Sequence, residues 1–129
     1  MLFSSRATLR FTIVVLLVTS GITLLFVQYM KPSSNTAAAI MSIWLVLPNA
    51  SWAAILARSS CYPERARSLQ LTAVVTSAAG VLFLTDVNFL HPDPQGAIAV
   101  FMTPMLQAIL SALVLVCLFL LSKLRNWRT

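Results

Sequence analysis

Three side chains near one turn of the chain are of types that could bind a metal ion or relay a proton. Asp86, His91 and Asp93 lie close together in the sequence. An imidazole with carboxylates is a common arrangement for a metal site or a proton relay. Here a single histidine accompanies two loosely spaced carboxylates, which is a weak signal. We therefore expect a solvated turn at His91 and Asp93, with no metal ion and no other cofactor.

Asp86 is the only acidic residue inside any of the long apolar segments of the chain. In a helix that continues to Leu90 it lies about 6 Å from the helix end, at a rise of about 1.5 Å per residue. An ionisable group inside a membrane segment is a functional candidate, because it needs water, a partner or protonation. The favoured alternative is an interfacial aspartate wetted by headgroups. Its nearest expected partners are Lys31, His91 and Tyr29.

Two uncharged amides, Asn49 and Gln107, lie near the middle of long apolar segments, and Ser20 and Ser77 lie at comparable depth in the other two. This mid-depth layer either forms a polar site for a ligand or pore, or it is a hydrogen-bonded core that fixes the helices in register. An amide buried in hydrocarbon must find a partner. We therefore favour the hydrogen-bonded core.

Patterns typical of catalysis are missing from the sequence. Its three glycines are not clustered into a phosphate-binding loop, and the Cys and His residues lack the spacing of a zinc site. The histidine has no serine or cysteine nucleophile nearby and no close pair of carboxylates. We predict that the protein is not an enzyme. Cys61 and Cys117 are expected to be free thiols on the reducing side of a membrane, with Cys117 filling space in the apolar core.

The composition indicates an integral membrane protein. The 129 residues, enough for one domain over residues 1–129, are 59% hydrophobic and only 9% charged. Soluble domains carry about a quarter charged residues, which cover their surface. This chain has too few charges to cover a water-soluble globule.

The charged residues leave four uncharged stretches, at residues 11–30, 32–57, 68–85 and 94–122. A helix needs about 20 apolar residues to cross a hydrocarbon core, whereas a strand needs about 10 with alternating polarity. None of the stretches alternates. We therefore predict an all-α integral membrane protein, with four transmembrane helices at about residues 11–30, 36–57, 69–90 and 97–122. Short connections favour an antiparallel up-down bundle.

Residues near the ends of these spans predict how the helices begin, end and bend. Pro32 is expected to end the first helix, and Ser34 or Asn35 to cap the second by accepting a hydrogen bond from a free backbone N–H. Pro48 lies near the centre of the second span, where it removes one backbone hydrogen bond.

The net charge of +6 is distributed unevenly. If each span crosses the membrane in turn, eight basic residues lie on one face of the membrane and Lys31 alone lies on the other. An excess of Lys and Arg marks the cytoplasmic side. Both termini are then cytoplasmic, as suits a bacterial inner membrane, and the basic side chains contact anionic lipid headgroups rather than nucleic acid. The residues of the basic face are Arg6, Arg10, Arg58, Arg65, Arg67, Lys123, Arg125 and Arg128.

Small residues in the third span form one face of a helix, at Ala73, Ser77 and Gly80. Such residues let another helix backbone approach closely, which is how membrane helices associate. The face serves either the internal bundle or a homo-oligomer, and we favour internal packing.

Two functions fit these observations. The favoured one is a non-catalytic accessory or interaction subunit of a larger membrane complex, which the small size, short loops, small-residue face and absent catalytic patterns indicate. The alternative is a small oligomeric transporter or channel, which would use Asp86 together with Asn49 and Gln107.

Overall fold

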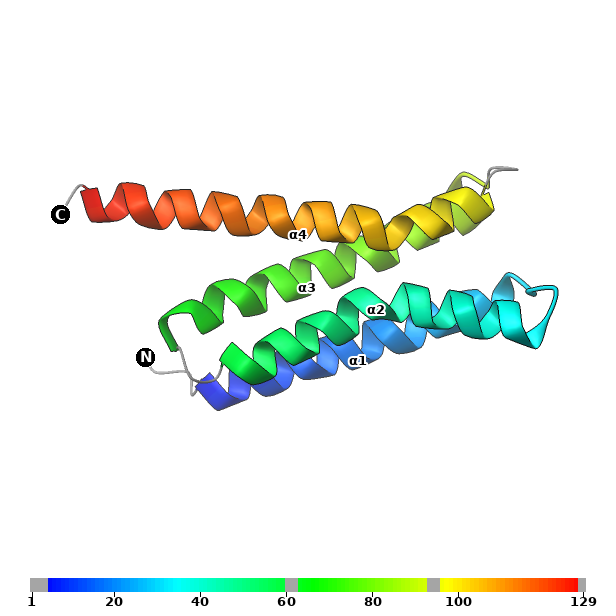
Figure 1. The fold of residues 1–129 in the computed structure, drawn as a ribbon, viewed down its shortest axis with the longest axis horizontal. Coiled ribbons are helices and arrows are strands. Elements are labelled where there is room, and N and C mark those ends of the chain that lie inside the picture. Colours follow the sequence, from blue (N-terminus) through cyan, green and yellow to red (C-terminus); the bar gives the residue numbers. More distant parts are fainter. Residues whose placement is uncertain (1–4, 60–62, 93–95, 128–129) are drawn as a thin grey trace.

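The computed structural model describes residues 5–59, 63–92 and 96–127, and nearly all of them are helical. Four long helices follow one another: α1 (Ser5–Tyr29), α2 (Asn35–Ser59), α3 (Pro63–Thr85) and α4 (Gly96–Trp127), with a short π-helix, η1 (Asp86–Leu90), directly after α3 (Figure 1). All four are long and apolar enough to cross a membrane. Cys61, Asp93 and Arg128 lie outside the described residues.

The helices cover the four predicted stretches except Met30, which lies just after α1, and most of them extend beyond the predicted bounds; the third stretch is covered by α3 together with η1. Helix α1 begins at Ser5 and α4 ends at Trp127, whereas the predicted spans begin at residue 11 and end at residue 122. The predicted bounds were placed at the first charged residues, such as Arg10 and Lys123. Arg and Lys favour helix almost as much as Ala does, so the helix continues past the apolar segment that defines a span.

The link between α1 and α2 has a defined conformation. Lys31 has a φ of 47°, the left-handed conformation that commonly ends a helix. The Met30 backbone N–H donates to the Phe26 carbonyl at 3.0 Å and so completes the last turn of α1. Ser34 Oγ accepts a hydrogen bond from the Ala37 backbone N–H at 3.1 Å, which confirms the prediction of a cap at this position.

The helices pack into a bundle in which α3 contacts each of the other three. Helix α2 also contacts α1 and α4, while the backbones of α1 and α4 do not approach each other closely among the described residues. The buried apolar side chains form two clusters, one of Phe26, Val27, Leu45, Leu84 and Val100, the other of Leu16, Trp52, Leu56 and Ala73.

The small-residue face of α3 lies inside this bundle. Ala73 and Ser77 are 0% and 1% exposed, and Gly80 is also buried. Thr72 and Thr76 on the same helix are buried too, and each hydroxyl donates to a carbonyl one turn earlier, at 2.8 Å. The polar atoms of this face are therefore satisfied while it packs closely against its neighbours.

The second half of helix α4 is packed less completely than the other helices. Only 6% of the most apolar stretch of α4 is buried, against 22% to 33% of the corresponding stretches of the other three helices. Figure 1 shows α4 separating from α3 toward Trp127. Leu115 still packs against the second cluster, but Cys117 is exposed, so the prediction that it fills space in the core is wrong. Large apolar side chains of this half, Leu113, Val116, Phe119, Leu120, Leu121 and Leu124, are exposed.

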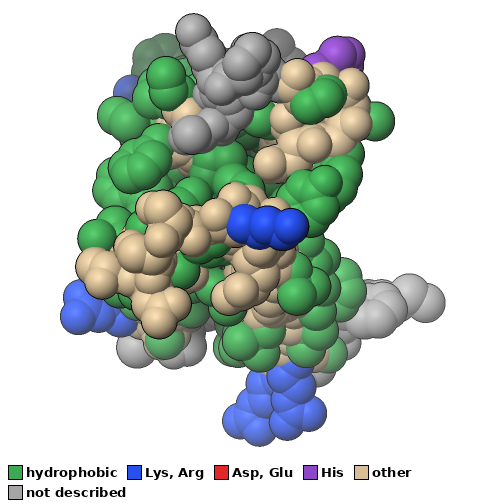
Figure 2. All heavy atoms as spheres, turned by 90° about the vertical axis from the view of Figure 1, so that its right-hand side faces the viewer, with side chains coloured by type: hydrophobic (Ala, Val, Ile, Leu, Met, Phe, Trp, Pro, Cys, Tyr) green, Lys and Arg blue, Asp and Glu red, His purple; other side chains and the backbone are tan. Residues whose placement is uncertain are grey.

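Hydrophobic side chains also dominate the outer surface of the bundle. Figure 2 views the molecule from the end at which the α1–α2 link lies, and green apolar side chains cover the flanks of the helices, with few blue Lys or Arg side chains among them. Such a surface suits contact with lipid or with another membrane protein rather than with water.

Candidate functional site

Asn49 joins three helices near the middle of the bundle. Its Nδ2 donates to Thr19 Oγ1 at 3.2 Å and to Ser20 Oγ at 3.0 Å, both on α1. Its Oδ1 accepts from Ser77 Oγ on α3 at 2.8 Å. The Thr19 and Ser20 hydroxyls donate their own protons to carbonyls of α1, which leaves their oxygens free to accept from Asn49. The side chain of Asn49 is only 5% exposed, so this network is closed within the bundle.

The structure thus brings together three of the four residues expected at mid-depth, Ser20, Asn49 and Ser77, and adds Thr19 to them. Gln107 is not bonded to this group. From α4 its Nε2 donates to the Thr76 backbone carbonyl of α3 at 3.1 Å. The amides therefore form two separate connections, one among α1, α2 and α3 and the other between α3 and α4.

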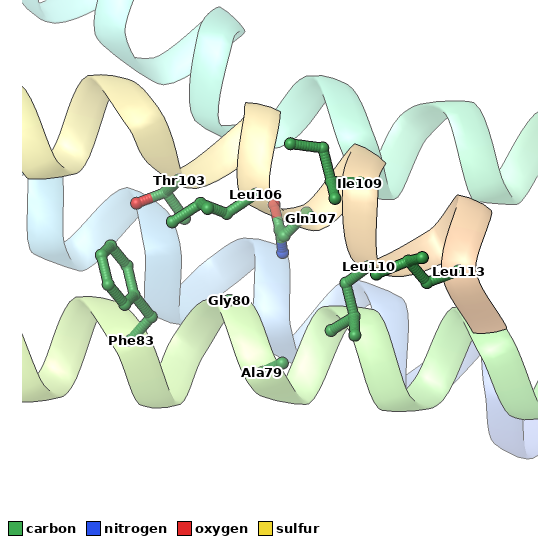
Figure 3. Close-up of a pocket in the computed structure, with 9 residues that line it drawn as sticks. All are labelled: Ala79, Gly80, Phe83, Thr103, Leu106, Gln107, Ile109, Leu110 and Leu113. Atoms are coloured by element: carbon green, nitrogen blue, oxygen red, sulfur yellow. The ribbon is translucent and has the colours of Figure 1, made fainter.

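A cavity of about 360 Å³ lies between α3 and α4 beside Gln107 (Figure 3). Its α3 wall includes Ala79, Gly80 and Phe83, and its α4 wall includes Leu106, Gln107 and Leu110. Leu106 is 43% exposed, which places it at the rim. We call this cavity the α3–α4 groove.

A second, larger groove of about 500 Å³ lies between α2 and α4 and contains both helix prolines, Pro48 and Pro104. Trp44 Nε1 donates to the Phe101 carbonyl at 2.8 Å across this groove. Trp44 is not among the predicted site residues. A signal was present, because a tryptophan inside a span must find an acceptor for its N–H.

Asp86 pairs with His91 at the far end of α3. Asp86 Oδ1 lies 2.8 Å from His91 Nδ1, and the side chains are 47% and 81% exposed respectively. The His91 backbone N–H donates to the Asp86 carbonyl at 2.8 Å, the wide turn of a π-helix, which brings the two side chains together. Of the three expected partners of Asp86, His91 is the one it pairs with, and the pair lies apart from the mid-depth amides.

Aromatic packing fixes the π-helix against α1. The Phe89 ring centroid lies 5.0 Å from that of Tyr29 and 5.7 Å from that of Phe26. Across residues 5–59, 63–92 and 96–127, no group of three or more His, Cys, Asp or Glu side chains is placed to hold a metal ion. Asp93, the third member of the candidate metal site, lies outside these ranges.

Comparison with known proteins does not assign a function. A scan against protein-family models and searches of curated proteins and of solved structures gave no match. We therefore infer function from the geometry of this chain.

Proposed function

We propose that this chain is a non-catalytic accessory subunit of a larger membrane complex, held to its partner by α4. The observation that supports this proposal is the exposure of the second half of α4, since only 6% of the most apolar stretch of this helix is buried. A helix of a self-sufficient bundle buries an apolar stripe against its neighbours along most of its length. Helix α4 does so near its start and leaves its second half for lipid or another protein.

The hydrogen bonding of the polar side chains favours an accessory subunit over a transporter. A solute pathway needs polar groups that face water or the solute. Asn49 instead bonds to Thr19, Ser20 and Ser77, and the amide nitrogen of Gln107 bonds to α3. These side chains hold helices together, as is typical of amides in membrane bundles.

We further propose that the helices cross a bacterial inner membrane alternately, as an up-down bundle with both termini in the cytoplasm. Both chain ends lie on the left in Figure 1, and the α1–α2 link lies on the right. The basic residues near the termini favour the cytoplasm and would contact anionic headgroups. A fluorescent protein fused after residue 129 is expected to be bright. Alkaline phosphatase, which needs an oxidising compartment, is expected to be active when inserted after Ser33. The reverse pattern would contradict this topology.

Deletion of the gene tests the accessory function in its native setting. Membranes with and without this chain are extracted in a mild detergent, separated by size, and the polypeptides in each fraction are identified. We expect one set of membrane polypeptides to move to smaller size without this chain and to return when it is expressed again. An unchanged size distribution would contradict the proposal.

A further inference from the structure

The amide of Gln107 uses only one of its two ends in hydrogen bonds with the residues that the structure describes. Its Nε2 donates to the Thr76 carbonyl at 3.1 Å. A carbonyl can only accept, so the amide must present its nitrogen to α3 and turn its oxygen, Oε1, away. Among the residues that the structure describes, none donates a hydrogen bond to Oε1.

This oxygen belongs to a deeply buried side chain that lines the α3–α4 groove, so we infer that its remaining surface faces that groove. The Gln107 side chain is 8% exposed and lines the groove (Figure 3). Every fully enclosed side-chain nitrogen or oxygen of the described residues has a hydrogen-bond partner, so the unpaired Oε1 must retain some exposed surface. The groove is also lined by Thr103, whose hydroxyl donates to the Ala99 carbonyl at 3.1 Å. Oε1 is therefore an acceptor without a donor in an otherwise apolar groove.

The chemistry of this acceptor restricts what can fill the groove. A buried polar atom left without a partner costs about 1–3 kcal/mol. An acyl chain has no hydrogen-bond donor, so lipid alone would leave Oε1 unpaired. The occupant that fits best is apolar along most of its length and carries one donor at the depth of Gln107.

The shape of the groove suits a helix. It extends from Thr103 to Leu113 along α4, about 15 Å at 1.5 Å per residue, or nearly three helical turns. Ala79 and Gly80 in the α3 wall permit close approach of another backbone. Ile109 and Leu113 at the rim are 57% and 58% exposed, so a helix could enter from the side.

A second copy of this chain is a poor source of the donor. At comparable depth its outer surface presents the Ser51 hydroxyl, which already donates to the Leu47 carbonyl of its own helix at 2.8 Å. The Asn49 amide, the nearest strong donor in sequence, is buried and bonded to α1. The missing donor is therefore better supplied by a different polypeptide.

We propose that the α3–α4 groove binds a transmembrane helix of a different polypeptide, and that an Asn or Gln side chain at mid-membrane depth on that helix donates a hydrogen bond to Gln107 Oε1. This inference rests on the accessory function proposed above, and it adds the docking face and the chemistry of the partner.

Photocrosslinking in intact membranes tests the proposal. A benzophenone amino acid is placed at Ile109, on the rim of the groove, or at Leu17, which is 67% exposed on α1, a helix that contributes no residue to the groove lining. We expect the Ile109 probe to give roughly tenfold more adduct with one other polypeptide than the Leu17 probe. The adduct should map to a membrane span of that polypeptide that carries an Asn or Gln side chain near its middle.

Two variants of the Ile109 probe protein test the groove and the acceptor separately. Ala79→Leu fills the groove and leaves the Gln107 bond to Thr76 in place. Gln107→Leu removes the acceptor, and loss of one interhelical hydrogen bond should reduce the adduct roughly threefold. Helical content and thermal unfolding are measured to confirm that each variant folds. The comparison of adduct yields from the Ile109 and Leu17 probes in the otherwise native sequence does not depend on either variant.

Adducts with a second copy of this chain, adducts with lipid alone, or equal labelling from Ile109 and Leu17 would each overturn the proposal. If another polypeptide co-purifies with this chain but is not labelled from Ile109, the α3–α4 groove is the wrong face while the accessory function stands. If no other polypeptide co-purifies or is labelled, the accessory function itself fails.

Discussion

Gln107 of α4 occupies the space that a side chain at position 80 of α3 would fill. A Cβ built on Gly80 would overlap Gln107 Nε2, the atom that bonds to the Thr76 carbonyl. The absence of a side chain at Gly80 is therefore what allows the Gln107 amide to reach the α3 backbone. This pair couples α3, which contacts each of the other three helices, to α4, whose most apolar stretch is only 6% buried.

Substitution of Gly80 by alanine should weaken the attachment of α4. The Gln107 amide would have to swing aside and lose its bond to Thr76, at a cost of about 1–2 kcal/mol in the free energy of unfolding. Thermal unfolding in a mild detergent, followed by circular dichroism, measures this change. Gly21→Ala is the matched control, because a Cβ there would have nothing within 4 Å, and it should be neutral or stabilise by up to about 1 kcal/mol.

The double variant Gly80→Ala with Gln107→Ala tests the cause of that loss. If the overlap explains it, the Gly80→Ala change should cost much less once the Gln107 side chain is short, so the two effects should not add. Additive losses would mean that Gly80 matters for another reason.

Asn49 should contribute more to stability than any other polar side chain at mid-depth. Its three side-chain hydrogen bonds reach two other helices, and interhelical hydrogen bonds in membranes average about 0.6 kcal/mol each. We expect Asn49→Leu to lower the free energy of unfolding by about 2 kcal/mol. Ser51→Ala on the exposed face of the same helix is the control and should change little. Equal losses from the two variants would show that the network does not stabilise the bundle.

The class of fold was predictable because it depends on composition and on the length of apolar segments. Four spans follow from the positions of charged residues alone, and the Ser34 cap follows from a local rule. Helix ends were less predictable. Nothing in the apolar pattern distinguishes the end of a span from the end of a helix, so α4 continues to Trp127.

The similar depth of the candidate site residues was predictable from the sequence, but the hydrogen bonds among them were not. Counting residues from the ends of spans places Ser20, Asn49, Ser77 and Gln107 at similar depth. Which of them form hydrogen bonds with one another depends on how each helix is rotated about its axis. The weak periodicity of the apolar residues does not reveal that rotation. The π-helix that joins Asp86 to His91 was also unforeseen, because one extra residue in a turn leaves no compositional signal.

Trp44 should connect α2 to α4 through a single hydrogen bond. Trp44→Phe keeps an aromatic ring beside Phe101, whose centroid lies 6.0 Å away, but removes the Nε1 donor to the Phe101 carbonyl. We expect a loss of about 0.6–1.7 kcal/mol in the free energy of unfolding. Trp127→Phe, at a ring that is 81% exposed, is the control and should leave the unfolding temperature unchanged. Identical unfolding of both variants would argue that the bond is not formed.

Asp86→Asn separates the accessory function from transport. Both side chains of the Asp86–His91 pair are exposed, and such pairs contribute about 0–1 kcal/mol to the free energy of unfolding. The variant should therefore fold, and it should retain its partner as well as the native sequence does when both are purified in a mild detergent. Loss of solute flux in cells carrying the variant, with folding intact, would instead support a transporter that uses Asp86.

The central claim, that this chain is a subunit of a larger membrane complex, is tested most directly by native mass spectrometry of the tagged protein extracted in a mild detergent. We predict an assembly whose mass exceeds that of this chain by the mass of one or more different polypeptides. A homo-oligomer or a lone monomer of 14.1 kDa would contradict the account.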